Sequence, residues 1–572
     1  MTSGSSKQQN AGPPNTMTTT NLTSKSVPQS DSQATVPTTQ LMSLKRVLGI
    51  PGASSMVAGI MIGSGIFISA RWVLVYSGSV GLAFFVWLLC AVVSFIGGLC
   101  WVELGLTFPK CGGEYILIKH TLGSVPAFAL IWLKTLITTP CSKAIGQLTF
   151  AHYVLGPFFP GCTDREDLVP LLKIIAVWSI CTLCLLNCLS ANWATRVQIV
   201  FTAGKFLALM LLIGTGFYSL AQGHTSSFKD SFKDTTTQIG MVGLAFQSGL
   251  WAYEGWDSLK DVTEEVKNPK RNMPWSVLGS VVLVTCCYFL VNVGYLAVLT
   301  PQELKESPAT AVLIYQAMIP VAKELAQHGW DVIAAEVMWP IQYCESTVVL
   351  LPYKLCSSTC VRFPSGMDRT RVSSVFYFWL CKWEFFLFSK LSIIQVYKYT
   401  IALAMVMLSA AREGHLPAVL AMIHTNKRTP IPALLLSTIT ACLFLIPKTS
   451  TVQSLMKVFS AAAWLTHTLT LIGLLWTRYK RPDLLRPFKL PIFIPVLFLF
   501  ISLYLTITPF VDAPVETSIP LVFVFLGIPM YYFFIYFKAT PRCIVICFEW
   551  ISFKTQQILN VKFPGIFKEI NE

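Results

Sequence analysis

Apolar residues along the chain gather into long runs that are separated by shorter polar and charged segments. A helix needs about 20 consecutive apolar residues to cross the hydrocarbon layer of a bilayer, and these runs have that length. We therefore predict an all-α polytopic membrane protein with about 12 transmembrane helices. The visible runs are 48–75, 79–107, 125–155, 168–190, 196–220, 238–260, 275–299, 431–447, 454–477, 490–510 and 518–539. The remaining helix, the eighth in order, is expected between the seventh run and residue 431.

The first run is interrupted at its centre by small residues, in Gly59-Ile60-Met61-Ile62-Gly63-Ser64-Gly65-Ile66-Phe67. Each glycine weakens a helix relative to alanine, which predicts a break in the first transmembrane helix. Unwound backbone inside a membrane is tolerated where it lines a polar cavity, so the break indicates a ligand site. Small residues also allow membrane helices to pack closely, and this motif alone leaves both interpretations open.

The sixth run contains a second interruption, between Gly249 and Gly255. The first and sixth helices hold equivalent positions in two halves of five helices each, and paired broken helices are typical of a transporter binding site. A broken helix offers free N–H groups at one end and free carbonyl groups at the other. A zwitterionic amino acid carries a carboxylate and an ammonium group that match both.

Two charged residues inside the apolar runs are candidate functional residues, because an ionised side chain in a membrane is costly unless it faces a cavity or a partner. Glu254 either recognises a cationic side chain of the substrate or pairs with an internal Lys or Arg. Lys205 either extends to the membrane interface or acts inside the helix bundle, and its position deep in the fifth run favours the second. Trp251 either packs against neighbouring helices or gates the substrate.

The composition agrees with a membrane protein, since 54% of the 572 residues are hydrophobic and 12% are charged. The net charge of +15 would suit nucleic acid, but Lys and Arg are concentrated in alternate loops. Cytosolic loops collect such residues, so we expect both termini in the cytosol and no nucleic-acid partner. The 17 cysteines and 7 histidines form no metal-binding pattern, and we expect no metal ion and no cofactor.

The two ends of the chain differ from the apolar runs. Residues 1–40 are rich in Ser, Thr, Gln, Asn and Pro, which predicts a disordered cytosolic tail. Residues 541–572 are expected to form a cytosolic tail with an amphipathic helix. Between them, a transmembrane domain is expected over 41–540, with repeat one at about 45–220, repeat two at about 238–477 and extra helices at about 490–539.

Residues 321–400 are atypical, because charged residues interrupt the segment in which the eighth helix should begin. Several charges within one run make a poor lipid-facing helix. The segment is either an exterior insertion, an alternative exon or a mispredicted part of the chain, and it replaces or displaces the start of the eighth helix.

Several motifs together resemble the L-type amino acid transporter family, the light chains of heteromeric amino acid transporters. They are Gly63-Ser64-Gly65-Ile66-Phe67, Glu103-Leu104-Gly105, Gly112-Gly113-Glu114-Tyr115, Gly249 to Asp257, Thr263-Glu264-Glu265 with Asn268-Pro269, and Arg412-Glu413-Gly414-His415. The resemblance covers roughly residues 43–320 and 405–540. It implies a LeuT-like fold: two inverted repeats of five helices, two additional helices, and breaks in helices one and six.

Within the family the chain looks most like the light chain for cystine and dibasic amino acids, which has Asp where this chain has Glu254. The resemblance implies a sodium-independent antiporter that works by alternating access. It would take cationic amino acids and/or cystine in exchange for neutral ones. A neutral amino acid exchanger, and a variant whose transport is impaired by the atypical eighth helix, are the alternatives.

The resemblance also assigns the substrate site to both breaks, at Ile62, Gly63, Ser64, Gly65, Ile66, Trp251, Ala252, Glu254 and Gly255. The first four residues are expected to hold the substrate carboxylate. Ile66 and the carbonyls around Trp251 and Ala252 would lie near the amino group, and Glu254 would read the side chain. Lys205 matches the basic residue that takes the place of a coupling sodium ion.

Cys162 follows the third run in a loop that we predict to be exterior. Alone, such a cysteine is either a free thiol or half of an intermolecular bridge. The resemblance implies a disulfide to a single-span glycosylated heavy chain and a position in the plasma membrane. The expected partners are therefore this heavy chain, amino acid substrates and the lipid bilayer.

Three other functions compete with transport as interpretations of the sequence. A channel would need a ring-forming repeat or a filter-like segment, which the sequence lacks. A membrane enzyme would need clustered His, Asp or Cys, whereas the histidines are dispersed. A binding or trafficking protein without transport activity is the strongest rival, because of residues 321–400.

Overall fold

The computed structural model describes the chain over 49–63, 65–108, 113–155, 166–189, 206, 209–210, 212–260, 266–306, 406–407, 409–425, 429–537 and 541–562. The chain divides into two units, Met1–Leu44 and Lys45–Glu572, and all described residues belong to the second. Residues 321–400, which the sequence marks as atypical, lie outside the described residues.

The described part is built almost entirely of helices, and seven of its helical segments are long and apolar enough to cross a membrane. They are α3 (Val80–Thr107), α5 (Ser124–Leu133) with η1 (Lys134–Thr138) and α6 (Thr139–Leu155), α7 (Val169–Leu189), α10 (Pro269–Val298), α17 (Val452–Lys480), α18 (Phe493–Ile507) with α19 (Pro509–Asp512), and α20 (Pro514–Tyr531) with η5 (Tyr532–Tyr536). An eighth is formed if α1 (Ile50–Met61) and α2 (Gly65–Ser77) are counted as one bent span. The predicted class, an all-α polytopic membrane protein, is confirmed.

Shorter elements connect these helices or continue them. Among them are α4 (Gly113–Thr121), a helix at Leu212–Ala221, η2 (Ser226–Phe228), α9 (Ile239–Tyr253), α11 (Pro301–Glu306), η4 (Ala418–Ala421), α16 (Ile431–Leu445) and α21 (Arg542–Leu559). Strands β1 (Ile423–His424) and β2 (Val561–Lys562) form an antiparallel pair in which Ile423 lies opposite Lys562.

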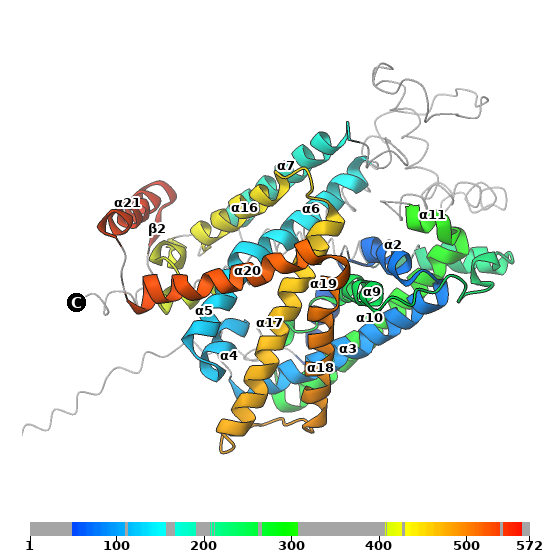
Figure 1. Cartoon of the computed structure of the whole chain (residues 1–572), viewed down its shortest axis with the longest axis horizontal. Coiled ribbons are helices and arrows are strands. Elements are labelled where there is room, and N and C mark those ends of the chain that lie inside the picture. Colours follow the sequence, from blue (N-terminus) through cyan, green and yellow to red (C-terminus); the bar gives the residue numbers. More distant parts are fainter. Residues whose placement is uncertain are drawn as a thin grey trace, which may run out of the picture. The chain divides into compact units, whose positions relative to one another are not determined.

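Helices that are far apart in the sequence pack side by side around the first helix pair (Figure 1). α2 packs against α9, α1 packs against α10, and α10 packs against α3. Large apolar side chains remain exposed on the outer faces of the long helices, such as Phe85 of α3, Ile174 of α7 and Phe500 of α18. Such faces are unfavourable in water but suit contact with lipid, as expected for a protein of this class.

The end of α3 is fixed to the end of α17 by a largely buried ion pair. Arg478 donates from Nε to Glu103 Oε1 at 2.9 Å, and its Nη2 pairs with the other carboxylate oxygen. Glu103 also accepts the backbone N–H of Leu490 at 3.0 Å. A buried charge pair requires further hydrogen bonds to offset its desolvation, and the Leu490 contact supplies one of them.

Candidate functional site

The first transmembrane segment is broken between α1 and α2. α1 ends at Met61, and Ile62 leaves the helical conformation with a φ of −71° and a ψ of 87°. The N–H of Ile62 still donates to the carbonyl of Ala58 at 2.8 Å, so the last turn closes before the chain bends. Gly63 is buried, Gly65 and Ile66 begin α2, and the two helices are bent by 56°.

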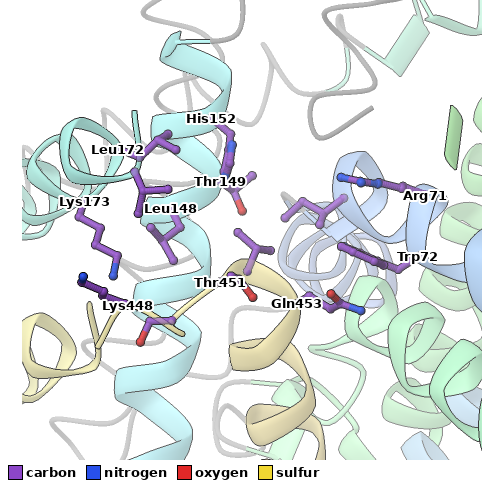
Figure 2. Close-up of a pocket in the computed structure, with 14 residues that line it drawn as sticks. Arg71, Trp72, Leu148, Thr149, His152, Leu172, Lys173, Lys448, Thr451 and Gln453 are labelled. Carbon is purple, nitrogen blue, oxygen red and sulfur yellow. The ribbon is translucent and has the colours of Figure 1, made fainter. Parts of the chain in front are cut away.

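A cavity of about 230 Å³ opens beside α2, which contributes Arg71 and Trp72 to its wall (Figure 2) and also Ile68. The other walls come from α6, α7, the segment before α17 and the first residues of α17 itself. The described residues of the two predicted breaks do not line this cavity. The cavity is therefore a neighbour of the breaks and not the space between them.

The second break follows α9, which ends at Tyr253. Glu254 has a φ of −52° and a ψ of 135°, and its N–H donates to the carbonyl of Trp251 at 3.3 Å. Gly255 then adopts a φ of 113°. Side chains are strained at such positive φ values, so glycine lets the chain turn away from the helix at this point.

The two breaks face each other at backbone contact distance. A Cβ atom on Gly65 would lie 2.6 Å from the Cα of Ala252, and a Cβ on Gly255 would lie 2.5 Å from Cγ2 of Ile60. Both distances are shorter than carbon atoms tolerate, so each glycine is required for the close approach of one helix to the other. The pairing predicted from the sequence is thus present as a direct contact between the breaks.

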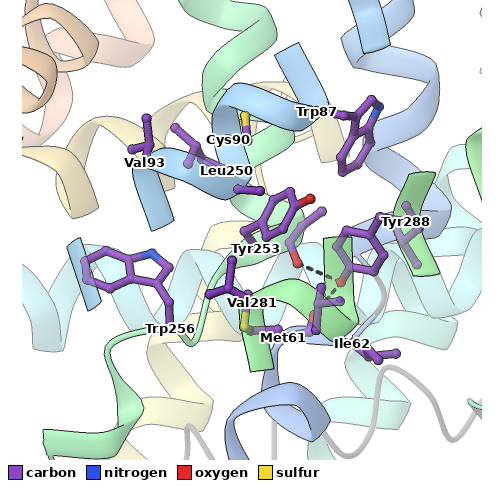
Figure 3. Close-up of a cluster of buried hydrophobic side chains, with 14 of the residues drawn as sticks. Met61, Ile62, Trp87, Cys90, Val93, Leu250, Tyr253, Trp256, Val281 and Tyr288 are labelled. Carbon is purple, nitrogen blue, oxygen red and sulfur yellow. Dashed lines mark hydrogen bonds between the residues drawn. The ribbon is translucent and has the colours of Figure 1, made fainter. Parts of the chain in front are cut away.

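The hydroxyl group of Tyr288 in α10 joins the ends of both broken helices (Figure 3). It lies 2.7 Å from the carbonyl oxygen of Met61 and 2.9 Å from that of Ala252. The ring is buried and contacts Trp87 and Tyr253, with centroid distances of 5.7 Å and 5.2 Å. One hydroxyl carries one hydrogen, so the two carbonyls share or alternate in this bond.

Sequence reasoning missed Tyr288, although one signal was present. A tyrosine within an apolar run must find a hydrogen-bond partner for its hydroxyl when it is buried. Only the structure identifies those partners, because Tyr288 and Met61 are separated by 227 residues in the sequence.

Trp251 lies in the last turn of α9 and its ring meets Phe459 of α17 edge to face, with centroids 4.6 Å apart. Its indole Nε1 is buried and has no hydrogen-bond partner among the described residues. A buried N–H group without a partner is costly, which makes this atom a candidate contact for a ligand or water. This position of Trp251 is compatible with both interpretations from the sequence, packing against neighbouring helices and gating of the substrate.

A network of charged side chains, buried or half-buried, lies beside the second break. Lys134 Nζ lies 3.0 Å from Glu114 Oε2, and Lys260 Nζ lies 3.7 Å from Glu114 Oε1. Lys260 also pairs with Asp257, and His467 Nδ1 lies 3.7 Å from Glu114 Oε1. Burial disfavours the charged form of Glu114, yet the neighbouring Lys134 and Lys260 hold the pKa of this carboxyl group below its usual value.

Glu254 lies within the electrostatic reach of this network and is acted on by Asp257, Glu114, Lys260 and Lys134. The two lysines offset part of its negative charge, while the two carboxylates oppose it. Both sequence-based interpretations of Glu254 therefore stay open. Three predicted functional residues, Ser64, Cys162 and Lys205, lie outside the described residues.

Comparison with known proteins decides the family of this molecule. The model of the amino acid permease family matches residues 48–330 and 372–537. The chain belongs to the amino acid permease family. The family match leaves out residues 331–371, which lie inside the segment that we found atypical.

Three curated relatives of this permease are similar over nearly their whole length. The b(0,+)-type amino acid transporter 1 of Mus musculus is 35% identical over 497 residues, which cover 87% of this chain and 89% of the relative. The large neutral amino acids transporter small subunit 2 of Homo sapiens is 34% identical over 528 residues, covering 92% and 87%. The Asc-type amino acid transporter 1 of Mus musculus is 33% identical over 527 residues, covering 91% and 87%.

These relatives confirm the resemblance to the amino acid transporter light chains and the expectation that the permease is a transporter and not an enzyme. The permease is an amino acid transporter of the multi-pass membrane type.

Proposed function

We propose that this permease is a sodium-independent amino acid exchanger that works by alternating access. The observation that supports the proposal best is the direct contact between the two breaks, at Gly65 with Ala252 and at Gly255 with Ile60. Broken helices that meet inside a membrane provide unpaired backbone groups for a polar substrate. A zwitterionic amino acid uses both the donors and the acceptors.

The substrate carboxylate would bind at the start of α2, through Ile62, Gly63, Ser64 and Gly65. The positive end of a helix dipole and its free N–H groups favour an anion at this position. The amino group would lie near Ile66 and the carbonyls of Trp251 and Ala252. Since the carbonyl of Ala252 also accepts from Tyr288 at 2.9 Å, its second lone pair is the one available to a substrate.

Lys205 would take the place of a coupling sodium ion in the fifth helix. An ammonium group at this position supplies a fixed positive charge, which is the electrostatic role of a bound Na⁺. Transport would then need no sodium gradient. As an exchanger, the permease would release one amino acid for each one that enters.

We propose that the permease takes cationic amino acids and/or cystine in exchange for neutral amino acids. Glu254 would recognise the side chain of the substrate. The b(0,+)-type relative and the large neutral relative each match the chain over most of its length. A neutral amino acid exchanger is the second candidate. It is favoured by Lys134 and Lys260, which already offset the charge of Glu254.

We also propose that Cys162 forms a disulfide with a single-span glycosylated heavy chain in the plasma membrane, with both termini of the permease in the cytosol. One relative is named a small subunit, which supports a partner subunit. In this orientation, the loop between α6 and α7 and the loop between α16 and α17 lie on the exterior side.

Uptake into proteoliposomes tests the proposal. Purified permease should accumulate radiolabelled leucine and arginine from sodium-free buffer when the vesicles contain unlabelled amino acid, and take up little when they are empty. Equal uptake by loaded and empty vesicles would contradict exchange. An absence of uptake of both substrates by the loaded vesicles would contradict the function itself and favour a binding or trafficking protein.

Glu254→Ala should lower arginine exchange about tenfold while leucine exchange changes little, because only arginine brings a positive side chain to this carboxylate. The measurement is kcat/KM for both amino acids in the same proteoliposomes. Glu306→Gln, which alters an exposed carboxylate in α11, is the matched control. An equal loss for arginine and leucine would assign Glu254 a structural role and favour the neutral exchanger.

A further inference from the structure

Four cysteines and one lysine gather where α6, α7 and α16 pack against one another (Figure 1). Lys143 belongs to α6, Cys181, Cys184 and Cys188 belong to α7, and Cys442 belongs to α16. All four cysteines are free. None of the five residues lies in either break or lines the cavity beside α2. The cluster is therefore separate from the site proposed for the transported amino acid.

Lys143 is a buried cation inside a membrane-spanning helix. The residue is 3% exposed, and its Nζ donates to Ser437 Oγ of α16 at 2.6 Å. No carboxylate in the described part of the chain forms an ion pair with it. The groups that act on its charge are the thiols of Cys184 and Cys442. A buried charge is costly without an opposite charge, and a thiolate is the counter-ion that these neighbours can supply.

Cys442 and Cys181 connect two helices through their sulfur atoms. The thiol of Cys442 on α16 forms a side-chain hydrogen bond with the thiol of Cys181 on α7, and Lys143 also acts on Cys442. An S–S bond is about 2.05 Å long, and sulfur atoms in contact can reach this distance by side-chain rotation with small shifts of the helices. The two helices are thus placed for a covalent link.

Both thiols are accessible from the membrane. Cys181 is exposed on α7, on the same face as the exposed side chains of Trp178 and Leu185, and Cys442 is half-buried. Because this apolar face contacts lipid, a reagent must enter the hydrocarbon layer to reach Cys181. Uncharged hydroperoxides can do so, whereas charged oxidants are excluded by the cost of their desolvation.

We propose that Cys181 and Cys442 are a hydroperoxide-sensitive thiol pair that closes to a disulfide between α7 and α16. Cys442 reacts first, because it lies next to Lys143, and Cys181 completes the bond. A thiolate is the reactive form of cysteine, and a neighbouring ammonium group stabilises it. The chemical class of the oxidant is a hydroperoxide, either hydrogen peroxide or a lipid hydroperoxide.

The reaction balances in two steps. The Cys442 thiolate attacks the terminal oxygen of the hydroperoxide, and the O–O bond breaks. The leaving alkoxide takes up the proton that the thiol lost, which gives a sulfenic acid and an alcohol, or water from hydrogen peroxide. The sulfur of Cys181 then attacks the sulfenic sulfur, and the hydroxyl group leaves as water with the proton of Cys181. The two thiols are oxidised, and one hydroperoxide is reduced.

Peptide mapping tests the pair without any requirement for transport. Full-length permease in liposomes is treated with hydrogen peroxide in one arm and with a phospholipid hydroperoxide in the bilayer in the other. Mass spectrometry without reducing agent should find the Cys181–Cys442 linkage as the main new disulfide, and dithiothreitol should remove it. The arm that forms it faster identifies the source of the oxidant. Absence of this linkage from both arms, or oxidation mainly of other cysteines, would overturn the proposal.

The order of the two steps is tested with single variants. In Cys181→Ser, the sulfenic acid cannot be resolved by Cys181, so dimedone should trap it at Cys442. In Cys442→Ser, Cys181 should remain available to a maleimide after peroxide treatment. Cys286→Ser removes an exposed thiol of α10 and should form the linkage like the wild type. Oxidation of Cys181 to the same extent with and without Cys442 would contradict the proposed order.

Lys143→Gln tests the contribution of the charge. Glutamine can still donate to Ser437 Oγ but carries no positive charge, and the linkage should form about tenfold more slowly. An equal rate in Lys143→Gln and the wild type would contradict the activation of Cys442 by Lys143. If this variant fails to fold, the trapping of Cys442 in Cys181→Ser still supports or rejects the pair.

Discussion

Gly65→Ala should reduce amino acid exchange about 100-fold, because it separates the two broken helices. The added Cβ would lie 2.6 Å from the Cα of Ala252, which is a backbone atom and has no rotamer by which to move away. α2 and α9 must therefore shift apart, and the backbone groups of both breaks lose their shared geometry. The measurement is the initial rate of leucine exchange in proteoliposomes that contain equal amounts of folded protein.

Gly214→Ala is the matched control for this variant. A Cβ on Gly214 would meet no atom within 4 Å, and this glycine also lies in an apolar helix, Leu212–Ala221. Its exchange rate and thermal unfolding should equal those of the wild type, or improve slightly through the helix preference of alanine. If Gly65→Ala were as active as Gly214→Ala, the contact between the breaks would not be part of the substrate site.

The sequence was sufficient to predict the broken helices because their signal is local. Glycines inside an apolar run mark a break wherever the run is long enough to span a membrane, and Gly63, Gly65 and Gly255 satisfy both conditions. The requirement for glycine at position 65 could not be predicted in this way. It arises because Ala252, a residue of another helix, lies 2.6 Å from the place where a Cβ on Gly65 would stand, and no local sequence pattern contains this contact.

The charge network could not be predicted for the same reason. Glu114 was visible only as one member of a family motif, and nothing in its neighbourhood points to His467. The folded chain brings Glu114, Lys134, Lys260 and His467 together from four separate parts of the sequence. In the low dielectric of the protein interior, each of these charges is stabilised by its charged neighbours. This mutual stabilisation exists only in the packed structure.

Tyr288→Phe should lower leucine exchange about tenfold or more while the permease remains folded. The substitution removes the hydroxyl that lies 2.7 Å from the carbonyl of Met61 and 2.9 Å from that of Ala252. A buried carbonyl that loses its donor costs about 1–3 kcal/mol, and the carbonyls of the two breaks lose the one hydroxyl hydrogen that they share. The ring is retained, so its contacts with Trp87 and Tyr253 should persist. Exchange kinetics and thermal unfolding are measured on the same preparation.

Tyr504→Phe provides the comparison, since it also removes one hydroxyl that donates to a backbone carbonyl, that of Ile239, at 3.2 Å. This bond lies away from both breaks, and the variant should exchange leucine like the wild type. Phenylalanine is the informative replacement for Tyr288, because a smaller residue would also leave a cavity costing about 3–5 kcal/mol. Equal exchange by Tyr288→Phe and the wild type would mean that Tyr288 only fills space. A specific loss would show that one hydroxyl couples the ends of α1 and α9, so that the two breaks must rearrange together during transport.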